Sequence, residues 1–300
     1  MRSLWGCAID ARRCARRSIR ESVWRTDRRM RIVSVRGHRI RLLDTGRARS
    51  VVLLAADAPV VLEHYASLID ILGEHRRVIA LEMPGFGFSF PSPAYRFTLG
   101  EQVDVVLGLL DVLGVERAHL AFTCVNALVA CAVARTAPAR IERLTVGQLP
   151  GVEEYRAWAR RIDISLAGLR LLATPGLGQA IMACAPGKIA GKWFDAVSGK
   201  RADSKALAAV SQQVYRRGGV FCLAALNQSL LDVSPDQVGP VGVPTTIVWG
   251  AADRSHRNTD RRSSLSIAPR AAFHELHELG HCFDVEDPAR AAQLILAADP

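Results

Sequence analysis

The sequence predicts an α/β fold in which a mostly parallel, doubly wound sheet carries a helical cap inserted late in the chain. Short β-rich runs alternate with segments of helical spacing as far as residue 151, a pattern typical of a parallel sheet covered on both faces. The alternation stops over residues 152–238, where segments of helical spacing follow one another without a convincing strand. We therefore predict a core from residues 31–151 and 239–300, a helical cap from 152–238 and a basic arm from 1–30.

The first part of the core begins with a predicted β-hairpin. Residues 31–36 and 38–44 alternate in character on either side of Gly37, and Val51–Ala56 is an apolar run expected for a strand buried on both faces. The remaining expected strands are Arg77–Leu81, His119–Phe122 and Arg143–Gly147, and the expected helices are Val61–Leu72, Leu99–Leu113 and Asn126–Arg135.

The second half of the chain is expected to be helical before the sheet resumes. Pro240 and Pro244 mark the return to the core. The cap helices are predicted around Tyr155–Leu172, Lys188–Val197, Ser204–Tyr215 and Val220–Leu231; two later strands are predicted at Thr245–Trp249 and Ala271–Leu276, and a closing helix at Pro288–Ala297.

The composition is that of a globular protein, with 49% apolar and 23% charged residues. No apolar run approaches the roughly 18–20 residues that a membrane-spanning helix needs, so we expect no span. Seven scattered cysteines without C-x-x-C pairs argue against a disulfide framework and favour a reducing compartment. We therefore predict a cytoplasmic protein.

The net charge of +10 is concentrated at the N-terminus. Residues 1–31 hold ten arginines against three acidic residues, and the rest of the chain is close to neutral. A basic arm can bind anionic lipid, nucleic acid or an acidic protein. We favour a simpler interpretation, a solvated Arg-rich helix or a start assigned upstream of Met30, and expect no nucleic-acid partner.

Three segments carry a resemblance to a known family. The run from Arg77 to Ser89 contains Glu82-Met83-Pro84-Gly85-Phe86-Gly87-Phe88-Ser89, the run Trp249–Asp253 ends a predicted strand, and Gly280-His281 lies shortly before the last helix. In these segments, and in their order, residues 31–300 resemble the α/β-hydrolase family. The first segment is similar to the family's D-x-P-G-x-G-x-S loop, with Glu82 in place of Asp.

The resemblance implies a catalytic triad of Cys124, Asp253 and His281. Cys124 stands where the family's G-x-S-x-G turn has its serine, but Phe122 and Asn126 replace the glycines. The resemblance then implies acyl transfer from, or hydrolysis of, an ester, thioester or lactone, with a thioester on Cys124 and no cofactor or metal. A histidine beside a cysteine allows a thiolate near neutral pH. The alternative for Cys124 is a purely structural role, as a small buried residue at the start of a helix.

The family's oxyanion hole is also altered. Ala55-Ala56-Asp57 replaces the usual H-G, so the implied donors are the backbone N–H groups of Asp57 and Val125. The Asp57 carboxylate would repel an oxyanion unless it is protonated or turned away. Asp57 is therefore either a new functional group or a sign that ester hydrolysis has been lost.

Two functions follow as alternatives. The first is an enzyme (esterase, thioesterase or acyltransferase) acting on a small-molecule acyl substrate, free or on a carrier. The second is a repurposed scaffold that binds a ligand or partner, or performs cofactor-free lyase or cyclase chemistry. The absence of an aspartate at position 124 and of a tryptophan after it argues against epoxide hydrolase and haloalkane dehalogenase chemistry. The oligomeric state stays open.

A zinc protease motif competes with this interpretation. The run from His277 to His281 matches H-E-x-x-H, which puts two histidines on one helical face. It follows directly on a predicted strand, and its longer form fails because Asp284 and Asp287 occupy the later Gly and His positions. We interpret the match as coincidence.

Overall fold

The computed structural model describes residues 4–14, 22, 24–46, 48–163, 165–166, 169–215 and 222–297. Its centre is an eight-stranded sheet in the order β1-β2-β4-β3-β5-β6-β9-β10. β1 and β2 are antiparallel to their neighbours, and every other pairing in the sheet is parallel. The strands are β1 Met30–Val35, β2 His38–Asp44, β3 Val51–Ala56, β4 Arg77–Glu82, β5 Ala118–Thr123, β6 Ile141–Gly147, β9 Thr245–Gly250 and β10 Ala272–Leu276. The predicted mostly parallel sheet is confirmed.

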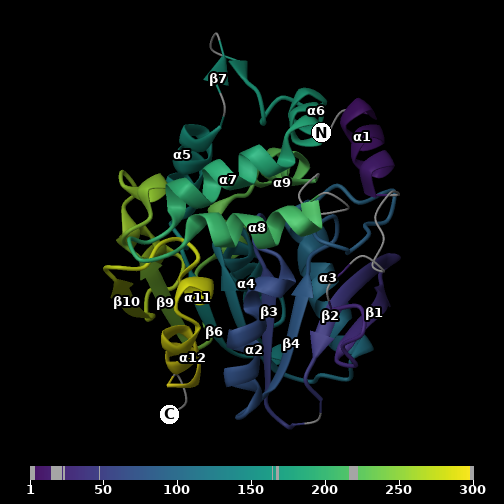
Figure 1. Ribbon diagram of the computed structural model, residues 1–300. Helices are drawn as coiled ribbons and strands as arrows, with labels where there is room; N and C mark the ends of the chain where they lie inside the picture. The colour runs from purple at the N-terminus through teal and green to yellow at the C-terminus, as the bar shows by residue number, and fades with distance from the viewer. Residues whose placement is uncertain are drawn as a thin grey trace.

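Helices cover both faces of this sheet, as the alternating pattern predicts (Figure 1). Alternate residues of β3 enter two different cores: Leu53 packs in the cluster that contains α3 and α4, and Leu54 in the cluster that contains α2 and α12. The core helices are α2 Ala66–Gly73 with the preceding 3₁₀ turn η2 Leu62–Tyr65, α3 Leu99–Val112, α4 Cys124–Thr136, α11 Phe283–Glu286 and α12 Pro288–Leu296; a 3₁₀ turn η3 Pro138–Arg140 precedes β6.

The segment between β6 and β9 is mainly helical, and Figure 1 shows its helices lying over the upper end of the sheet. They are α5 Val152–Ile162, α6 Leu177–Cys184, α7 Pro186–Val197, α8 Ser204–Tyr215, α9 Leu223–Leu230 and α10 Pro235–Val238. The expected helix at 188–197 and the one at 204–215 form. α6 and α10 were not expected, and residues 220–221 of the last predicted cap helix lie outside the described residues.

Two expectations for this segment, a helix over 155–172 and the absence of strands, are wrong. The helix predicted over 155–172 ends at Ile162, and a short two-stranded ribbon follows, made of β7 Ser165–Leu166 and β8 Leu169–Arg170. The carboxylate of Asp163 accepts hydrogen bonds from the backbone N–H groups of Leu172 (2.8 Å) and Ala173 (3.0 Å). These bonds tie the chain back on itself where a helix would have continued, which is how Asp residues compete with helical backbone bonding.

The described part of the N-terminal arm contains helix α1, Leu4–Cys14. One face of this helix is buried, because Gly6 lies against Gln179 of α6, and Arg13 donates to the carbonyl of Ala183 (2.9 Å). The interpretation as a solvated Arg-rich helix is therefore wrong for the buried face of this stretch. Arg2, Arg16, Arg17 and Arg20 of the predicted arm lie outside the described residues.

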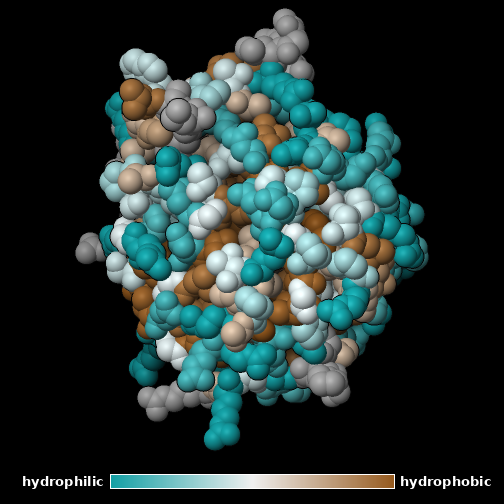
Figure 2. Space-filling model, turned by 180° about the vertical axis from the view of Figure 1, so that it is seen from behind, coloured by the Kyte–Doolittle hydropathy of each residue, from teal (hydrophilic) through white to brown (hydrophobic). Residues whose placement is uncertain are grey.

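The surface is mixed in character. Figure 2 shows hydrophilic side chains spread over the rear face, with hydrophobic residues visible between them. Leu4, Trp5, Val112 and Leu177 are the large hydrophobic residues that are well exposed among those described. Within the described part of the chain, no helix combines the length and the apolarity needed to cross a bilayer.

Candidate active site

Cys124 lies at a sharp turn between strand β5 and helix α4. It is the first residue of α4 and has a positive φ of 52°, a conformation that non-glycine residues adopt rarely. Its side chain is buried but lines a cavity at the carboxyl end of the sheet. A strained residue aimed into a cavity from a strand-to-helix turn is the geometry of a nucleophile elbow.

The two departures from the glycine pattern are accommodated locally. The side-chain amide of Asn126 donates to the backbone carbonyl of Ala56 (3.1 Å), which joins the start of α4 to the end of β3. Phe122 is fully buried in the same core cluster as Leu120 and Val129. The turn therefore forms with a large side chain in one glycine position and a hydrogen-bonded amide in the other.

Asp253 follows β9 and is hydrogen-bonded on both carboxylate oxygens. Oδ2 accepts from His281 Nδ1 (2.6 Å) and from Gln148 Nε2 (3.0 Å), and Oδ1 accepts from the backbone N–H of Ser255 (2.8 Å). Burial alone would raise the pKa of Asp253, but the His281 ring outweighs it and the pKa is lowered. Asp253 is thus held as a carboxylate that orients the imidazole.

His281 lies in the loop after β10, between aromatic rings. Its ring stacks on His256 at 5.6 Å between centroids and meets Trp193 edge-on at 5.4 Å, and Trp158 stacks on His256 at 4.6 Å. Burial lowers the pKa of His281, yet Asp253 more than compensates and leaves that pKa raised. The second ring nitrogen, Nε2, is buried without a hydrogen-bond partner among the described residues. It is the atom free to take a proton.

Asp57 and Cys124 line the cavity at its floor and lie close to His281. One carboxylate oxygen, Sγ and one ring nitrogen all lie within 4.8 Å of one another. Burial raises the pKa of Asp57 to about 7, with His281 and the Cys124 thiol opposing the rise. Burial and the Asp57 carboxyl raise the pKa of Cys124 well above its ordinary value. The expectation of a thiolate near neutral pH is therefore wrong for the resting site, because desolvation disfavours the charged sulfur.

A further carboxyl lies close behind this group. Asp284 accepts hydrogen bonds from the hydroxyls of Tyr65 (3.1 Å) and Thr123 (3.5 Å), and burial raises its pKa to about 6. Sequence reasoning did not single out Asp284, Gln148 or His256 as part of the site. Asp284 lies shortly after His281, Gln148 directly follows β6, and His256 lies shortly after Asp253. This closeness in sequence to predicted site elements is the only signal that could have found them.

The cavity above Cys124 has a volume of about 480 Å³, within the range of small-molecule sites. The sheet contributes Asp57 and Cys124 to its wall, and the helical segment contributes Trp158, Trp193 and Met182 among others. Much of the remaining wall is apolar. The segment between β6 and β9 therefore forms much of the cavity wall.

The site also contains metal-ligand types. Carboxylate, thiolate and imidazole are zinc donors, and the cavity-floor group brings one of each together. A metal there would occupy the atoms that the proposed chemistry below requires. The H-E-x-x-H match does not form a helical zinc site: residues 277–281 are turn and loop, and the side chain of His277 is 79% exposed whereas that of His281 is 2% exposed.

No family model matches the chain. Among curated proteins, a 2-hydroxymuconate semialdehyde hydrolase from Pseudomonas sp. is 24% identical over 289 residues, covering 86% of this chain and 89% of that protein. A 2-hydroxy-6-oxo-2,4-heptadienoate hydrolase from Pseudomonas putida is 31% identical over 124 residues, covering 41% of this chain and 45% of that protein. Both relatives are hydrolases, which supports a hydrolase-type enzyme.

Solved structures resemble the chain over most of its length. A putative alpha/beta hydrolase from Nostoc sp. has a TM-score of 0.73 at 19% identity, covering 89% of this chain and 96% of that one. The chain has the α/β-hydrolase fold. An epoxide hydrolase from Mycobacterium thermoresistibile (TM-score 0.73, 17% identity, 90% of this chain and 97% of that one) and an esterase from Thermogutta terrifontis (0.65, 20%, 89% and 97%) share this fold. At sequence identities this low, the solved structures support the α/β-hydrolase fold and nothing finer.

Proposed function

We propose that the protein is a hydrolase or acyltransferase that acts on an ester, thioester or lactone through a thioester on Cys124. One observation carries the proposal: Cys124 lies at the positive-φ turn on the cavity floor, beside a His281 ring that Asp253 holds at 2.6 Å. A nucleophile, a base and an orienting acid in this relation are the parts of a catalytic triad. Cysteine at the turn, with no aspartate there, favours acyl chemistry over epoxide opening.

The mechanism follows from the protonation states. Because the resting Cys124 is a thiol, His281 Nε2 takes the S–H proton as Sγ attacks the acyl carbonyl. The tetrahedral intermediate collapses to a thioester, and the leaving alcohol or thiol takes that proton from His281. Water, or an acceptor alcohol, amine or thiol, then attacks the thioester while His281 accepts its proton. This second step releases the acid or the new acyl product and restores the thiol.

Asp57 sets a condition on this mechanism. Its carboxyl is beside Cys124, where the carbonyl oxygen of a bound substrate would become an oxyanion. As a carboxylate it would oppose that charge, whereas as a neutral acid it would donate a hydrogen bond to it. With a pKa of about 7, a substantial fraction of Asp57 is protonated at neutral pH. The neutral form is therefore the active form in this proposal.

The test is intact-mass spectrometry after incubation with a panel of acyl thioesters and activated esters. The wild type should gain one acyl group, and Cys124→Ala should gain none. Cys131→Ala is the matched control, because Cys131 lies on the same helix and is buried in the core. It should acylate like the wild type. Equal acylation of Cys124→Ala, for example on the exposed Cys184, would contradict the proposal.

The position of Asp57 also favours a second candidate, proton-transfer chemistry of the lyase or cyclase type. Here Asp57 and His281 would exchange protons with the substrate, and Cys124 would only pack beside them. The two candidates differ in one comparison. Turnover that survives Cys124→Ala and is lost in Asp57→Asn supports proton transfer, and the reverse pattern supports the thioester.

A further inference from the structure

Four cationic side chains line the outer part of the cavity. Arg161 comes from α5, Lys192 from α7, and Arg254 and Arg257 from the 3₁₀ turn η4 (Arg254–His256) and the residue that follows it. All four residues are exposed, whereas Asp57 and Cys124 at the other end of the cavity are buried. Positive charge therefore gathers at the mouth of a cavity whose chemistry lies at its floor.

None of the four cations forms an ion pair with a carboxylate among the described residues. Arg161 donates to the hydroxyl of Thr259 (2.8 Å), and Arg254 donates to the backbone carbonyls of Asp195 and Ala196. Only one acidic side chain, Asp57, is found among the described residues that line the cavity, and it lies at the floor. The positive charge at the mouth is thus not neutralised by the cavity wall.

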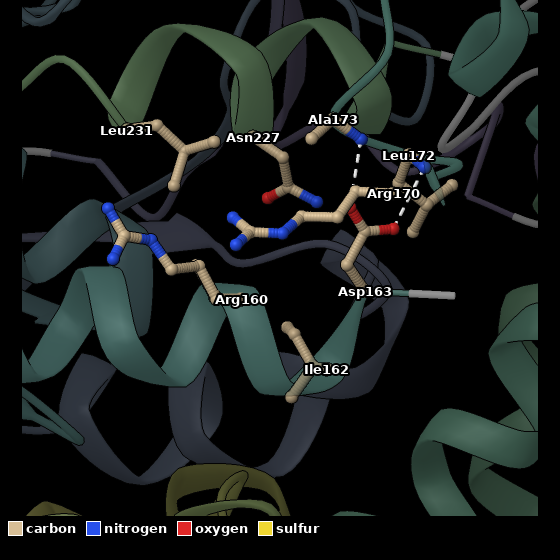
Figure 3. A pocket seen from close by; sticks show the side chains of 9 residues that line it. Arg160, Ile162, Asp163, Arg170, Leu172, Ala173, Asn227 and Leu231 are labelled. Atoms are coloured by element: carbon tan, nitrogen blue, oxygen red, sulfur yellow. Dashed lines mark hydrogen bonds between the residues drawn. The ribbon is translucent and has the colours of Figure 1, made fainter. Parts of the chain in front are cut away.

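Two acids in the segments that form the mouth have other partners. The carboxylate of Asp195 accepts from the Ser204 hydroxyl (2.6 Å), and that of Asp163 accepts the two backbone N–H bonds shown in Figure 3. Neither carboxylate forms an ion pair with any of the four cations among the described residues. An anion arriving from solvent is therefore the partner that this mouth lacks.

The interior between mouth and floor suits a different part of the same ligand. Its wall includes the apolar side chains of Ile162, Leu172, Met182, Ile189 and Leu223. A buried Arg or Lys would be expected beside the floor if the acyl part itself were charged, yet every Arg and Lys among the described residues that line the cavity is exposed. The acyl part is therefore apolar, and the charge belongs to the part of the ligand that remains at the mouth.

The adjoining small cavity is not the anion site. Figure 3 shows Arg170 reaching toward Asn227 there, with Ile162 and Leu172 shared between this cavity and the large one. Its volume is about 20 Å³, room for a water molecule and not for a phosphate group.

We propose that the substrate is an apolar acyl thioester or ester whose leaving group carries several phosphate charges, bound at the mouth by Arg161, Lys192 and Arg257. Multiple exposed cations match a multiply charged group, and guanidinium groups bind phosphate oxygens in pairs. The acyl end of this assignment rests on the function proposed above, and the anion end rests on the mouth alone. Arg254 is left out of the test because it also holds α7.

The first experiment compares kcat/KM for three thioesters of one acyl group: hexanoyl-coenzyme A, hexanoyl-4′-phosphopantetheine and hexanoyl-N-acetylcysteamine. We expect a fall of at least about tenfold from the first to the last, with the second between them. Each of Arg161→Gln, Lys192→Gln and Arg257→Gln should reduce use of the coenzyme A thioester by about threefold, and the triple variant by about 20-fold, as befits exposed charges. Use of the uncharged thioester should not change.

Arg117→Gln is the matched control, because Arg117 is exposed and precedes β5, whose other end leads into Cys124. It should leave all three kcat/KM values unchanged. Raising sodium chloride from 0.05 to 0.5 M should erase most of the preference for coenzyme A in the wild type and little in the triple variant. Equal kcat/KM for the three thioesters, or a preference that the triple variant retains, would overturn the proposal.

A second measurement separates this proposal from the proposed function. Desulfo-coenzyme A, which has the phosphates but no reactive sulfur, is titrated into wild type, the triple variant and Cys124→Ala by calorimetry. Binding that is weakened at least tenfold in the triple variant and kept in Cys124→Ala supports the anion site even if no thioester is turned over. Absence of binding to the wild type overturns it, whatever the acylation experiment gives.

Discussion

Two buried carboxyl groups at the ends of neighbouring strands have opposite surroundings. Ala56, the last residue of β3, is paired with Glu82, the last residue of β4, so Asp57 and Glu82 belong to the same edge of the sheet. Both side chains are almost fully buried, and burial raises the pKa of each. Sequence and burial alone would treat them alike.

Glu82 belongs to a closed ionic cluster. Its carboxylate accepts from the backbone N–H of Phe88 (2.7 Å) and lies 3.6 Å from Arg41, which also pairs with Glu63 at 2.5 Å. A Cβ on Gly87 would collide with the Glu82 carboxylate, which explains a glycine at that place in the loop. Neither of the two cavities described above has Glu82 in its wall.

Asp57 instead faces the large cavity and has Cys124 and His281 as neighbours, both of which are titratable. A buried carboxyl is thus structural where a fixed cation neutralises it and chemical where its neighbours are titratable and open to a ligand. If this distinction is right, changes near Asp57 should alter rates, and changes at Glu82 should alter stability.

The largest effect is expected from Asp253→Asn. An amide at this position favours the wrong tautomer of His281, so the acylation rate should fall by about 10⁴-fold while the fold is kept. Acylation kinetics and thermal unfolding measure the two quantities. The exposed Asp236→Asn serves as control and should change neither. A retained acylation rate would remove Asp253 from the mechanism.

Glu82→Gln should destabilise the protein by about 3 kcal/mol, because Arg41 keeps its charge in a fully buried position with one counter-charge fewer. Urea unfolding gives the free energy, and the alkylation rate of Cys124 should not change. The control is Asp70→Asn, since Asp70 pairs with Arg29 at the surface and its loss should have little effect. An equal loss of unfolding free energy in both variants would show that the Arg41 cluster stabilises the protein no more than a surface ion pair does.

Asp57→Asn should increase the rate at which iodoacetamide alkylates Cys124 at pH 7 by about tenfold. Burial and the Asp57 carboxyl raise the thiol pKa, so removing the carboxyl's charge lowers that pKa and leaves more thiolate to react. Mass spectrometry of the Cys124 peptide over time measures the rate. An unchanged or slower rate would mean that Asp57 does not control the thiol, and the comparison with Glu82 would lose its basis.

Asp284 is intermediate between Glu82 and Asp57. It accepts a hydrogen bond from Tyr65, as a structural carboxyl would, but it also lies close to His281. Its pKa is about 6 in the folded protein against 3.8 as the ordinary value, so the folded state binds the proton more tightly and stability falls as pH rises from about 4 to 6. Asp284→Asn should remove about 2 kcal/mol of this pH dependence between pH 4.5 and 7.5. Urea unfolding at pH 4.5 and 7.5 checks it, and a dependence as steep as that of the wild type would contradict it.

Much of the fold could be predicted because local pattern and tertiary environment agree. Val51–Ala56 is apolar throughout, since β3 is buried on both faces, and its predicted bounds are those observed. The pattern failed where one side chain redirected the backbone. Asp163 ended α5 early by bonding residues 172 and 173, a contact between positions that no periodicity connects.

The candidate site, like the fold, could be predicted only in part from the sequence. The sequence by itself determined that Cys124, Asp253 and His281 are present in an order compatible with a triad, because each follows a strand whose end lies at one edge of the sheet. Only the tertiary structure decided their protonation and surroundings: burial and Asp57 hold Cys124 as a thiol, and His256 and Trp193 enclose the imidazole. The mouth with its cations was also beyond the sequence, because α5, α7 and η4 meet only when the chain has folded. Desolvation and proximity depend on distances between segments that are far apart in the chain. The local pattern of apolar and polar residues does not determine those distances.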